Sequence, residues 1–551
     1  MGLSPPEIDL AAADFAEVLG QALARGAHLL TRGECVVVER MRALPESALA
    51  LYARLTLRVG TVWAADTLPA ESVGTLVEAG LLSPLVTWSQ RAEASTVSEL
   101  KDGCRRLGLR LGGRRDALIE RLAGHRRWTE RRFVRLVHPA LVRRLEQWAW
   151  LRRNPDRSAA VVQRLGILRW PDYPLTPGVR LFRTRSAFRR WDDRSRSMDA
   201  VPPETWLAWL ADPVPAPGRL ALHGGLVRRV RHAARELERA GEPHSAVALY
   251  EALVTGGHVA QDSVVCRWAL ALEAAGRQSE ALRRLRDARG DADGGAALAI
   301  GRTGRRMARR CRAGWPPDRP LRTAPERTLR LVHHADADAS RPLWGSGDPA
   351  VIERAVMQLL HGHGRRVVRG EAPLWRSLVA LLMTPVLFEP VAGQLPVPYL
   401  SAPLDWRTPA FTDRRRAGVE AILAAVRAGE GADRVARACA QWRGTRVAGV
   451  RWTYTDDELV DVAAALDGVA LAQLCRHWLE GRRGVGRGLP DLLVLPGPSV
   501  RLDAFPSRLS ESLVAVEVKG PSDALRDEQV VWLDRLLGWG VRAEVWQVRP
   551  G

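Results

Sequence analysis

The stretch SLVAVEVKGPSDALRDEQVVWLDRLLGWGVRAEVWQVRP, residues 512–550, reads as strand, helix and strand. Its first part, Ser512–Gly520, alternates and is rich in valine, which predicts a central β-strand. The next part carries apolar residues at helical spacing, with Asp523 expected to cap its start and Gly540 its end. Val541–Pro550 then reads as a second strand. The pattern predicts an α/β domain.

An acidic residue precedes another predicted strand, Leu492–Leu495. This residue, Asp491, lies 26 positions before Glu517. If the two strands are neighbours, as chain order favours, Asp491 and Glu517 converge. Glu517 and Lys519 share a strand face because their spacing is two. Paired carboxylates repel, so the pattern indicates a site for one or two Mg²⁺ or Mn²⁺ ions.

Lys519 is one of two lysines among 82 basic residues, the other being Lys101. Arginine is a flat fork, whereas the lysine ammonium is compact and can reach a water beside a metal. We therefore expect Lys519 to position the attacking water and to stabilise charge on a phosphate. The alternative is a strand-edge salt bridge of Lys519 with Glu517 or Asp491.

The net charge of +20 and the pI of about 11.0 suggest a polyanionic partner, most simply nucleic acid. The six cysteines are scattered singly, without C-x-x-C, so neither a zinc finger nor a disulfide framework is predicted. No uncharged apolar run approaches 18 residues, and the N-terminus does not read as a signal peptide. These features predict a soluble, intracellular protein without membrane association.

A chain of 551 residues is too long for one core, so we expect a multidomain protein. Its N-terminal two-thirds reads as largely α-helical, ahead of the α/β domain. The predicted parts are a helical region at 1–94, a helical hairpin at 95–125, an Arg/Trp-rich connecting region at 126–225, helical repeats at 226–313 and the α/β domain at 329–551. A proline-rich linker, Gly314–Thr328, precedes the last part.

The hairpin at 95–125 has two short helices around a basic Gly-Gly turn and resembles the SAP module, which holds duplex DNA. Ser95 is the expected N-cap of its first helix. The residues expected to contact DNA phosphates are Lys101, Arg114 and Arg115. A plain helical hairpin with a solvated basic turn is the alternative.

The repeats align Gly241 over Gly276 and Ala246 over Ala281, at an offset of 35 residues. This period is close to that of tetratricopeptide-like helix pairs, in which small residues stand where two helices touch. Two units are few for a free-standing solenoid. We expect them to bridge the N-terminal and C-terminal parts.

The constellation P-D…E-x-K is the signature of the PD-(D/E)xK nucleases. The sequence RGLPDLLVL…VAVEVKGPSDALRDEQ resembles their VRR-NUC domain, and the wider chain resembles the Fanconi-associated nuclease family. The resemblance implies a restriction-endonuclease-like fold and a structure-selective nuclease that cuts near 5′ flaps and branched DNA. It also implies 5′-to-3′ exonuclease activity and a role in interstrand-crosslink repair.

The resemblance further implies which residues form the site. The implied catalytic residues are Asp491, Glu517, Lys519 and Glu371, and the implied metal ligands are Glu371, Asp491, Glu517 and the carbonyl of Val518. Glu371 is preferred over Glu389 because it opens a helix after a strand. The helix is expected to break at Met383–Pro385, where the family often has an acidic residue.

Arginines before Asp491 are expected to hold a DNA phosphate near the metals, and they are Arg482, Arg483 and Arg487. General surface basicity is the alternative for this group. HHADAD (333–338) and HGHG (361–364) are interpreted as a solvated loop and a helix-to-strand turn. The chain lacks the Cys/His set of a ubiquitin-binding zinc finger, which favours a bacterial setting. We expect a cytoplasmic, nucleoid-associated protein that is a monomer rather than an obligate oligomer.

Two other functions fit the same features. A Holliday-junction resolvase or restriction-like nuclease could use the same core. A non-catalytic DNA-binding repair scaffold is suggested by the SAP-like hairpin, the repeats and the charge, although an intact D…E-x-K argues against it.

Overall fold

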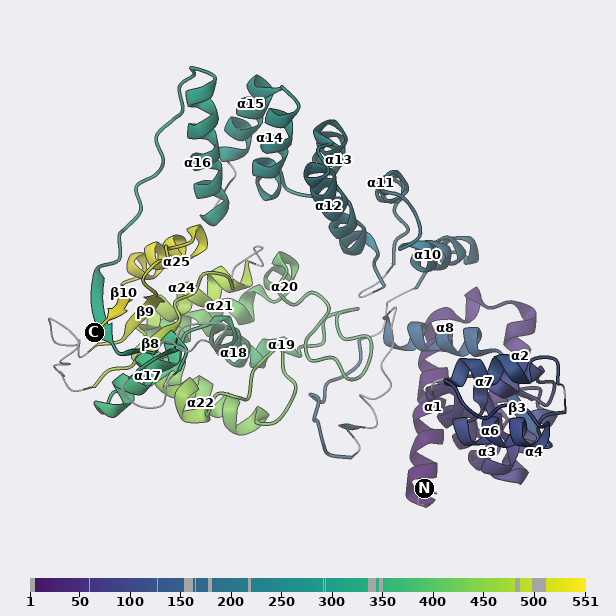
Figure 1. The fold of residues 1–551 in the computed structure, drawn as a ribbon. Helices are drawn as coiled ribbons and strands as arrows, with labels where there is room; N and C mark the ends of the chain where they lie inside the picture. The colour runs from purple at the N-terminus through teal and green to yellow at the C-terminus, as the bar shows by residue number, and fades with distance from the viewer. Residues whose placement is uncertain are drawn as a thin grey trace.

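The computed structural model describes residues 5–58, 60–125, 127–152, 162–163, 165–176, 181–216, 220–290, 292, 294–334, 343–345, 350–480, 486–497 and 512–551. A helical unit at the N-terminus and an α/β domain lie at opposite ends of the molecule, and an arch of helices joins them (Figure 1). The predicted multidomain fold class is therefore confirmed. Within the described ranges, every helix is too short or too polar to cross a lipid bilayer.

The N-terminal unit packs helices around a small antiparallel sheet. Its main helices are α1 (Pro5–Gly26), α2 (Arg32–Arg42), α3 (Glu46–Leu57), α4 (Ala70–Glu78) and α8 (Pro139–Trp150). Its strands are β1 (Val62–Ala64), β2 (Leu82–Ser83) and β3 (Phe133–Leu136), in the order β1-β3-β2. The sequence had indicated a helical region at 1–94, without strands. Strands of two to four residues are too short to show alternation.

The hairpin consists of α6 (Val97–Arg106) and α7 (Arg115–Leu122), preceded by α5 (Trp88–Ala94). It has a small core of its own, in which Leu100, Leu118 and Trp128 are buried. The predicted N-cap was wrong by one residue. Thr96 caps α6 through a capping box with Glu99, while Ser95 ends α5.

The arch contains paired helices that turn in the same way. Its members are α10 (Arg185–Ser197), α11 (Pro203–Ala211), α12 (His223–Arg239), α13 (Pro243–Thr255), α14 (Val265–Ala274), α15 (Gln278–Arg289) and α16 (Gly294–Arg310). Gly241 and Gly276 both have φ of 78°, a left-handed conformation that favours glycine. Ala246 and Ala281 are both fully buried. The two turns are thus equivalent, as the 35-residue offset predicts.

The α/β domain is built on a five-stranded sheet in the order β4-β10-β9-β8-β7. Its strands are β4 (Glu326–Leu331), β7 (Val367–Arg369), β8 (Leu492–Val494), β9 (Val514–Lys519) and β10 (Arg542–Pro550). β9 is central and fully buried, as its valines predict. It pairs in parallel with β10 and antiparallel with β8. A short hairpin of β5 (His333–His334) and β6 (Leu343–Trp344) stands apart from this sheet.

Helices cover both faces of this sheet. One face, with Val516 and Val518, packs on α17 (Ile352–Gly362). The other, with Ala515, packs on a group of helices. The group comprises α18 (Ala372–Leu382), α19 (Thr384–Leu387), α20 (Pro409–Arg414), α21 (Arg416–Ala425), α22 (Gly431–Trp442), α23 (Asp456–Ala465), α24 (Gly468–Leu479) and α25 (Asp527–Gly538). Glu517 and Lys519 alternate with the valines and so belong to this second face.

Several local features of the α/β domain had been predicted from the sequence. The break between α18 and α19 falls at Met383, as expected. His363 and Gly364 form the predicted turn after α17.

Of HHADAD, the two histidines form β5 and the other four residues lie outside the described residues. Asp523 does not cap α25, because residues after Gly520 first form a turn and Arg526 is the N-cap. Gly540, with φ of 83°, does end it.

Candidate active site

Asp491 and Glu517 come together because β8 and β9 are neighbouring antiparallel strands. Leu492 pairs with Val516, so the next position on each strand brings Asp491 beside Glu517. The backbone N–H of Val518 donates to Asp491 Oδ2 at 2.9 Å and fixes that carboxylate. The convergence expected from chain order is thus present in the structure.

Lys519 and Gln529 complete the polar contacts of Glu517. The Lys519 ammonium lies 3.0 Å from Glu517 Oε1 and also donates to Gln529 Oε1 at 3.0 Å. The Gln529 amide donates to the same Glu517 oxygen. Gln529 stands in the first turn of α25, where its Oε1 also accepts from the backbone N–H of Arg526 at 2.9 Å. Its presence on the helix was visible in the sequence, but its contact with both charged groups was not.

Burial makes ionisation of this carboxylate pair unfavourable. Glu517 is 1% exposed, and desolvation, followed by the charge of Asp491, raises its pKa to about 8. Desolvation also raises the pKa of Asp491 to about 6, with a further contribution from the charge of Glu353 on α17. Lys519 acts in the opposite direction on both groups, but it does not outweigh burial. A cation bound between the two carboxylates would offset the free-energy cost of ionising them.

Glu371 is the N-cap residue of α18. The residue before it, Gly370, contacts the backbone of Asp491. The N–H of Gly370 donates to the Asp491 carbonyl at 2.7 Å. A Cβ at Gly370 would lie 2.5 Å from the Pro490 carbonyl oxygen, so this close approach requires glycine. Glu389, the alternative, follows α19 and lies near Gly418 instead. The residue before Glu371 thus lies against the Asp491 backbone, while the preference for Glu371 over Glu389 as a ligand stays a prediction.

The carboxylate pair has the donor chemistry of a divalent-cation site. Among the described residues, no group donates a hydrogen bond to Glu517 Oε2, although this atom is buried. Hard cations prefer such oxygen ligands. Among the residues that the structure describes, no group of three acidic, histidine or cysteine side chains lies close enough together to hold a metal ion. Asp491 and Glu517 thus fit a cation as a pair, with Glu371 and the Val518 carbonyl as the further predicted ligands.

The predicted DNA contacts have different surroundings. Arg482 and Arg483 lie outside the described residues. Arg487 is exposed just before β8, and Lys101 and Arg114 are exposed on the hairpin. Arg115 donates to the carbonyls of Glu93 and Ser95, so its guanidinium also ties α7 to the end of α5. That contact gives Arg115 a structural role that the sequence did not indicate.

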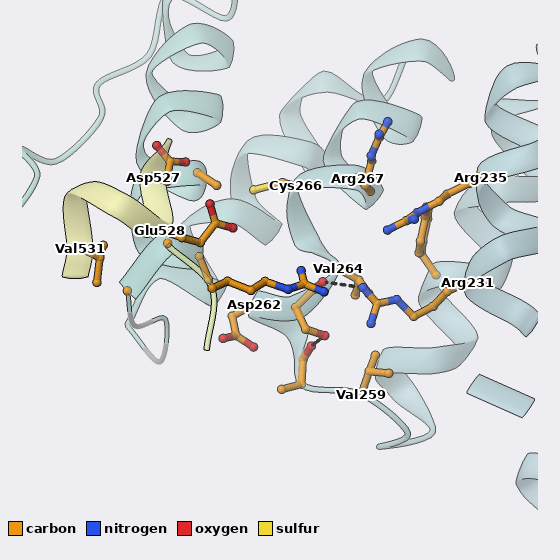
Figure 2. A pocket seen from close by; sticks show the side chains of 18 of the residues that line it. Arg231, Arg235, Val259, Asp262, Val264, Cys266, Arg267, Asp527, Glu528 and Val531 are labelled. Carbon is orange, nitrogen blue, oxygen red and sulfur yellow. Dashed lines mark hydrogen bonds between the residues drawn. The ribbon is translucent and has the colours of Figure 1, made fainter. Parts of the chain in front are cut away.

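A cleft of about 980 Å³ separates the helical arch from α25. Figure 2 shows Arg231, Arg235 and Arg267 on its arch side, and Asp527 and Glu528 of α25 on the other side. Arg487 and Arg535 line it as well. Because Gln529 belongs to the same helical turn as Glu528, α25 stands between this cleft and the carboxylate pair.

α16 and α25 hold the two sides of this cleft together. Arg302 of α16 forms a two-pronged ion pair with Asp527, with one pair of atoms, Nη2 and Oδ2, 2.5 Å apart. The helical arch therefore touches the very helix that supplies Gln529.

Comparison with known proteins identifies two domains in the chain. A model of the VRR-NUC domain matches residues 429–550, and a model of the SAP domain matches residues 92–127. The chain is 28% identical over 560 residues to the Fanconi-associated nuclease 1 homologue of Pseudomonas aeruginosa, covering 94% of this chain and 92% of that protein. The homologue of Arabidopsis thaliana is 30% identical over 207 residues.

These relatives differ in how much of their length is matched. The matched stretch spans 22% of the Arabidopsis protein and 20% of human Fanconi-associated nuclease 1. Among solved structures, "paFAN1 bound to 2nt 5'flap DNA with gap" has a TM-score of 0.79 and 25% identity, with 100% of both chains covered. The structural likeness thus extends over the helical parts as well as the α/β domain.

The α/β fold, its carboxylate pair and the VRR-NUC match define a nuclease domain, a class that depends in general on divalent metals. The whole chain resembles bacterial homologues of Fanconi-associated nuclease 1. The resemblance that the sequence predicted is therefore confirmed.

Proposed function

We propose that this protein is a structure-selective DNA nuclease that hydrolyses phosphodiester bonds near 5′ flaps, with 5′-to-3′ exonuclease activity, in interstrand-crosslink repair. The observation that carries the proposal is the buried pair of Asp491 and Glu517 with Lys519 beside it. One buried oxygen of the pair lacks a donor among the described residues. A buried carboxylate oxygen without a donor, next to a second carboxylate, has the chemistry of a cation ligand.

Asp491, Glu517, Glu371 and the Val518 carbonyl would hold one or two Mg²⁺ or Mn²⁺ ions. Bound there, the metal would supply Lewis acidity and would neutralise charge on the phosphate. Lys519 has three N–H donors, two of which are used by Glu517 and Gln529. The third is available for the attacking water or for a phosphate oxygen. Gln529 keeps the ammonium and the carboxylate in register, so the donor is pre-oriented.

The expected substrate is flapped or branched double-stranded DNA. The solved structure of paFAN1 named above contains 5′-flap DNA. In the present chain the SAP domain supplies one basic surface, with Lys101 and Arg114 exposed on it. The arginine-lined cleft beside α25 supplies a second, which would receive a displaced strand. We expect a monomer in the bacterial cytoplasm, associated with the nucleoid.

Cleavage of a 5′-flap DNA in the presence of Mn²⁺ tests the proposal. The wild type should cut close to the flap, while Lys519→Ala and Asp491→Ala should lose at least about 10³-fold in rate. Equal cutting by both variants would disprove the site assignment. A preference for four-way junctions or plain duplex would favour the resolvase or restriction-like alternative. Absence of metal-dependent cutting on every substrate would favour the scaffold.

A further inference from the structure

Three arginines from separate segments lie around α18, the helix that has Glu371 as its N-cap. We call Arg376 on α18, Arg407 in the loop before α20 and Arg451 in the loop before α23 the arginine cluster. The backbone N–H of Arg451 donates to Ser377 Oγ at 2.9 Å. Because Ser377 follows Arg376 in the chain, this bond places Arg451 close to Arg376. Arg407 and Arg451 both act electrostatically on Arg376. Across the described ranges, no carboxylate forms a salt bridge with any of the three guanidinium groups.

Arg376 is unusual for a surface cation because part of its guanidinium is desolvated. Its Nε is buried and finds no hydrogen-bond partner among the described residues. Burial, followed by the charges of Arg407 and Arg451, lowers the pKa of Arg376. Like charges that converge on a half-buried, unpaired cation destabilise a fold unless an anion joins them. The cluster therefore has the electrostatics of an incomplete anion site.

The cluster lies close to the proposed catalytic groups. Arg376 is five residues along the chain from Glu371, about 7.5 Å along a helix axis. A Cβ at Gly486, which precedes Asp491 by five residues, would be 3.7 Å from Arg376 Nη2. DNA carries a phosphate every 3.4 Å or so along the axis of each strand. An anion in the cluster would thus be about one to three nucleotides away from the bond that is cut.

We propose that Arg376, Arg407 and Arg451 form a binding site for a DNA backbone phosphate within about one to three nucleotides of the scissile phosphate. The site fixes which bond reaches the carboxylate pair. This inference rests on the proposed nuclease function. Guanidinium groups bind phosphate as flat forks, so one anion can satisfy several of the donors that the protein leaves free.

A scan with uncharged phosphates tests the site. A series of 5′-flap substrates carries one methylphosphonate each, at every position up to four nucleotides on either side of the cut. Wild-type kcat/KM should fall about tenfold or more at one position within three nucleotides. Arg376→Gln and Arg451→Gln should lose a similar factor on unmodified DNA and lose almost nothing further at that position. Arg437→Gln, an exposed arginine on α22, is the matched control and should remain sensitive to the modification.

Two further readouts separate the possible outcomes. If the arginine substitutions and the methylphosphonate act additively at every position, the cluster does not hold that phosphate and the inference is wrong. If the wild type itself fails to cut unmodified flaps, the proposed function fails instead. Thermal unfolding excludes a merely structural role: Arg376→Gln should keep or raise Tm, since it relieves repulsion, whereas a large fall in Tm would overturn the proposal.

Discussion

Two buried glutamates on adjacent parallel strands have very different hydrogen-bond partners. Glu544 on β10 is 2% exposed and Glu517 on β9 is 1% exposed. Glu544 is surrounded by donors: Arg327 Nε lies 2.7 Å from Oε2 and Arg542 Nη2 lies 2.9 Å from Oε1. Trp546 also donates to Oε2 at 2.9 Å. Both oxygens of Glu544 are satisfied.

Glu517 has fewer donors and a carboxylate for a neighbour. Lys519 and Gln529 share its Oε1, while Oε2 finds no donor among the described residues. Asp491 adds repulsion and helps to raise the pKa of Glu517 to about 8. Burial alone therefore does not distinguish a structural carboxylate from a functional one. Glu517 differs from Glu544 in two ways together: it has a second carboxylate beside it, and one of its oxygens has no donor among the described residues.

The largest expected effect is on catalysis at Glu517. Glu517→Gln should lower flap cleavage by at least about 10³-fold, because an amide holds a divalent cation poorly. Its Tm should change little, since the amide ends the repulsion with Asp491 but also weakens the pairing with the buried ammonium of Lys519. Cleavage assays and thermal unfolding of the same preparation check both halves. Cutting within tenfold of the wild type would contradict the role of Glu517.

Glu544→Gln should show the reverse pattern. The substitution removes the negative charge that Arg327 faces in a buried pair, so the free energy of unfolding should fall by about 2–3 kcal/mol. The more exposed Arg542 should contribute little to that change. Urea unfolding measures the loss, and cleavage below the unfolding transition should stay within about fivefold of the wild type. A large loss of activity with full stability would show that the two glutamates are not so different.

The pH dependence of stability should come from the Asp491–Glu517 pair. Their folded-state pKa values, about 6 and about 8, are raised, so the folded protein holds protons that the unfolded chain releases near pH 4. That contribution is complete below the unfolded pKa values and is lost as pH rises through 6 and then 8. In EDTA the slope should not exceed about 1.4 kcal/mol per pH unit for each group.

Unfolding measured from pH 5.5 to 8.5 checks this prediction. Excess Mg²⁺ should restore stability at the alkaline end, because the cation binds the ionised pair. Glu517→Gln should flatten the slope and the Mg²⁺ response, whereas Glu544→Gln should leave both in place. A wild-type slope of the opposite sign would mean that the pair is already ionised in the folded protein.

The smallest expected effect is at Gln529. Gln529→Met keeps the size of the side chain but removes the contacts with both Glu517 and Lys519. Cleavage should fall about five- to tenfold, the loss of one or two hydrogen bonds to charged groups. Arg437→Gln, the change at an exposed arginine on α22, serves as the control. Equal rates for Gln529→Met and the wild type would show that Lys519 is positioned without Gln529.

Much of the α/β domain could be predicted because its signals are local. The alternation in β9, the spacing of Glu517 and Lys519, and the adjacency of β8 all follow from short stretches of sequence. Gly370 illustrates what local reasoning misses: its need for glycine arises from a carbonyl 120 residues away, that of Pro490. The influence of Glu353 on Asp491 likewise comes from a helix on the opposite face of the sheet.

Errors in the sequence analysis fell mostly at the ends of elements. Ser95 and Thr96 are both good N-cap residues, and only the reciprocal contact with Glu99 selects Thr96. Asp523 looked equally suitable for α25, but the turn after Gly520 delays the helix to Asp527. The arginine cluster could not be foreseen either, because its members come from one helix and two loops that lie far apart in the sequence and come together only in the folded domain.

The pairing of β4 with β10 has a consequence for the timing of biosynthesis. β4 begins at Glu326, yet its only partner within the described sheet, β10, begins more than two hundred residues later at Arg542. At about 5–20 residues per second, a ribosome needs roughly 10–40 seconds to make the intervening chain. During that interval β8 and β9 also arrive late, so Asp491 and Glu517 have no sheet to hold them. Under the proposed function, a truncated translation product that ends before β9 would have the SAP domain and the helical arch for holding DNA but would lack the groups for cutting it.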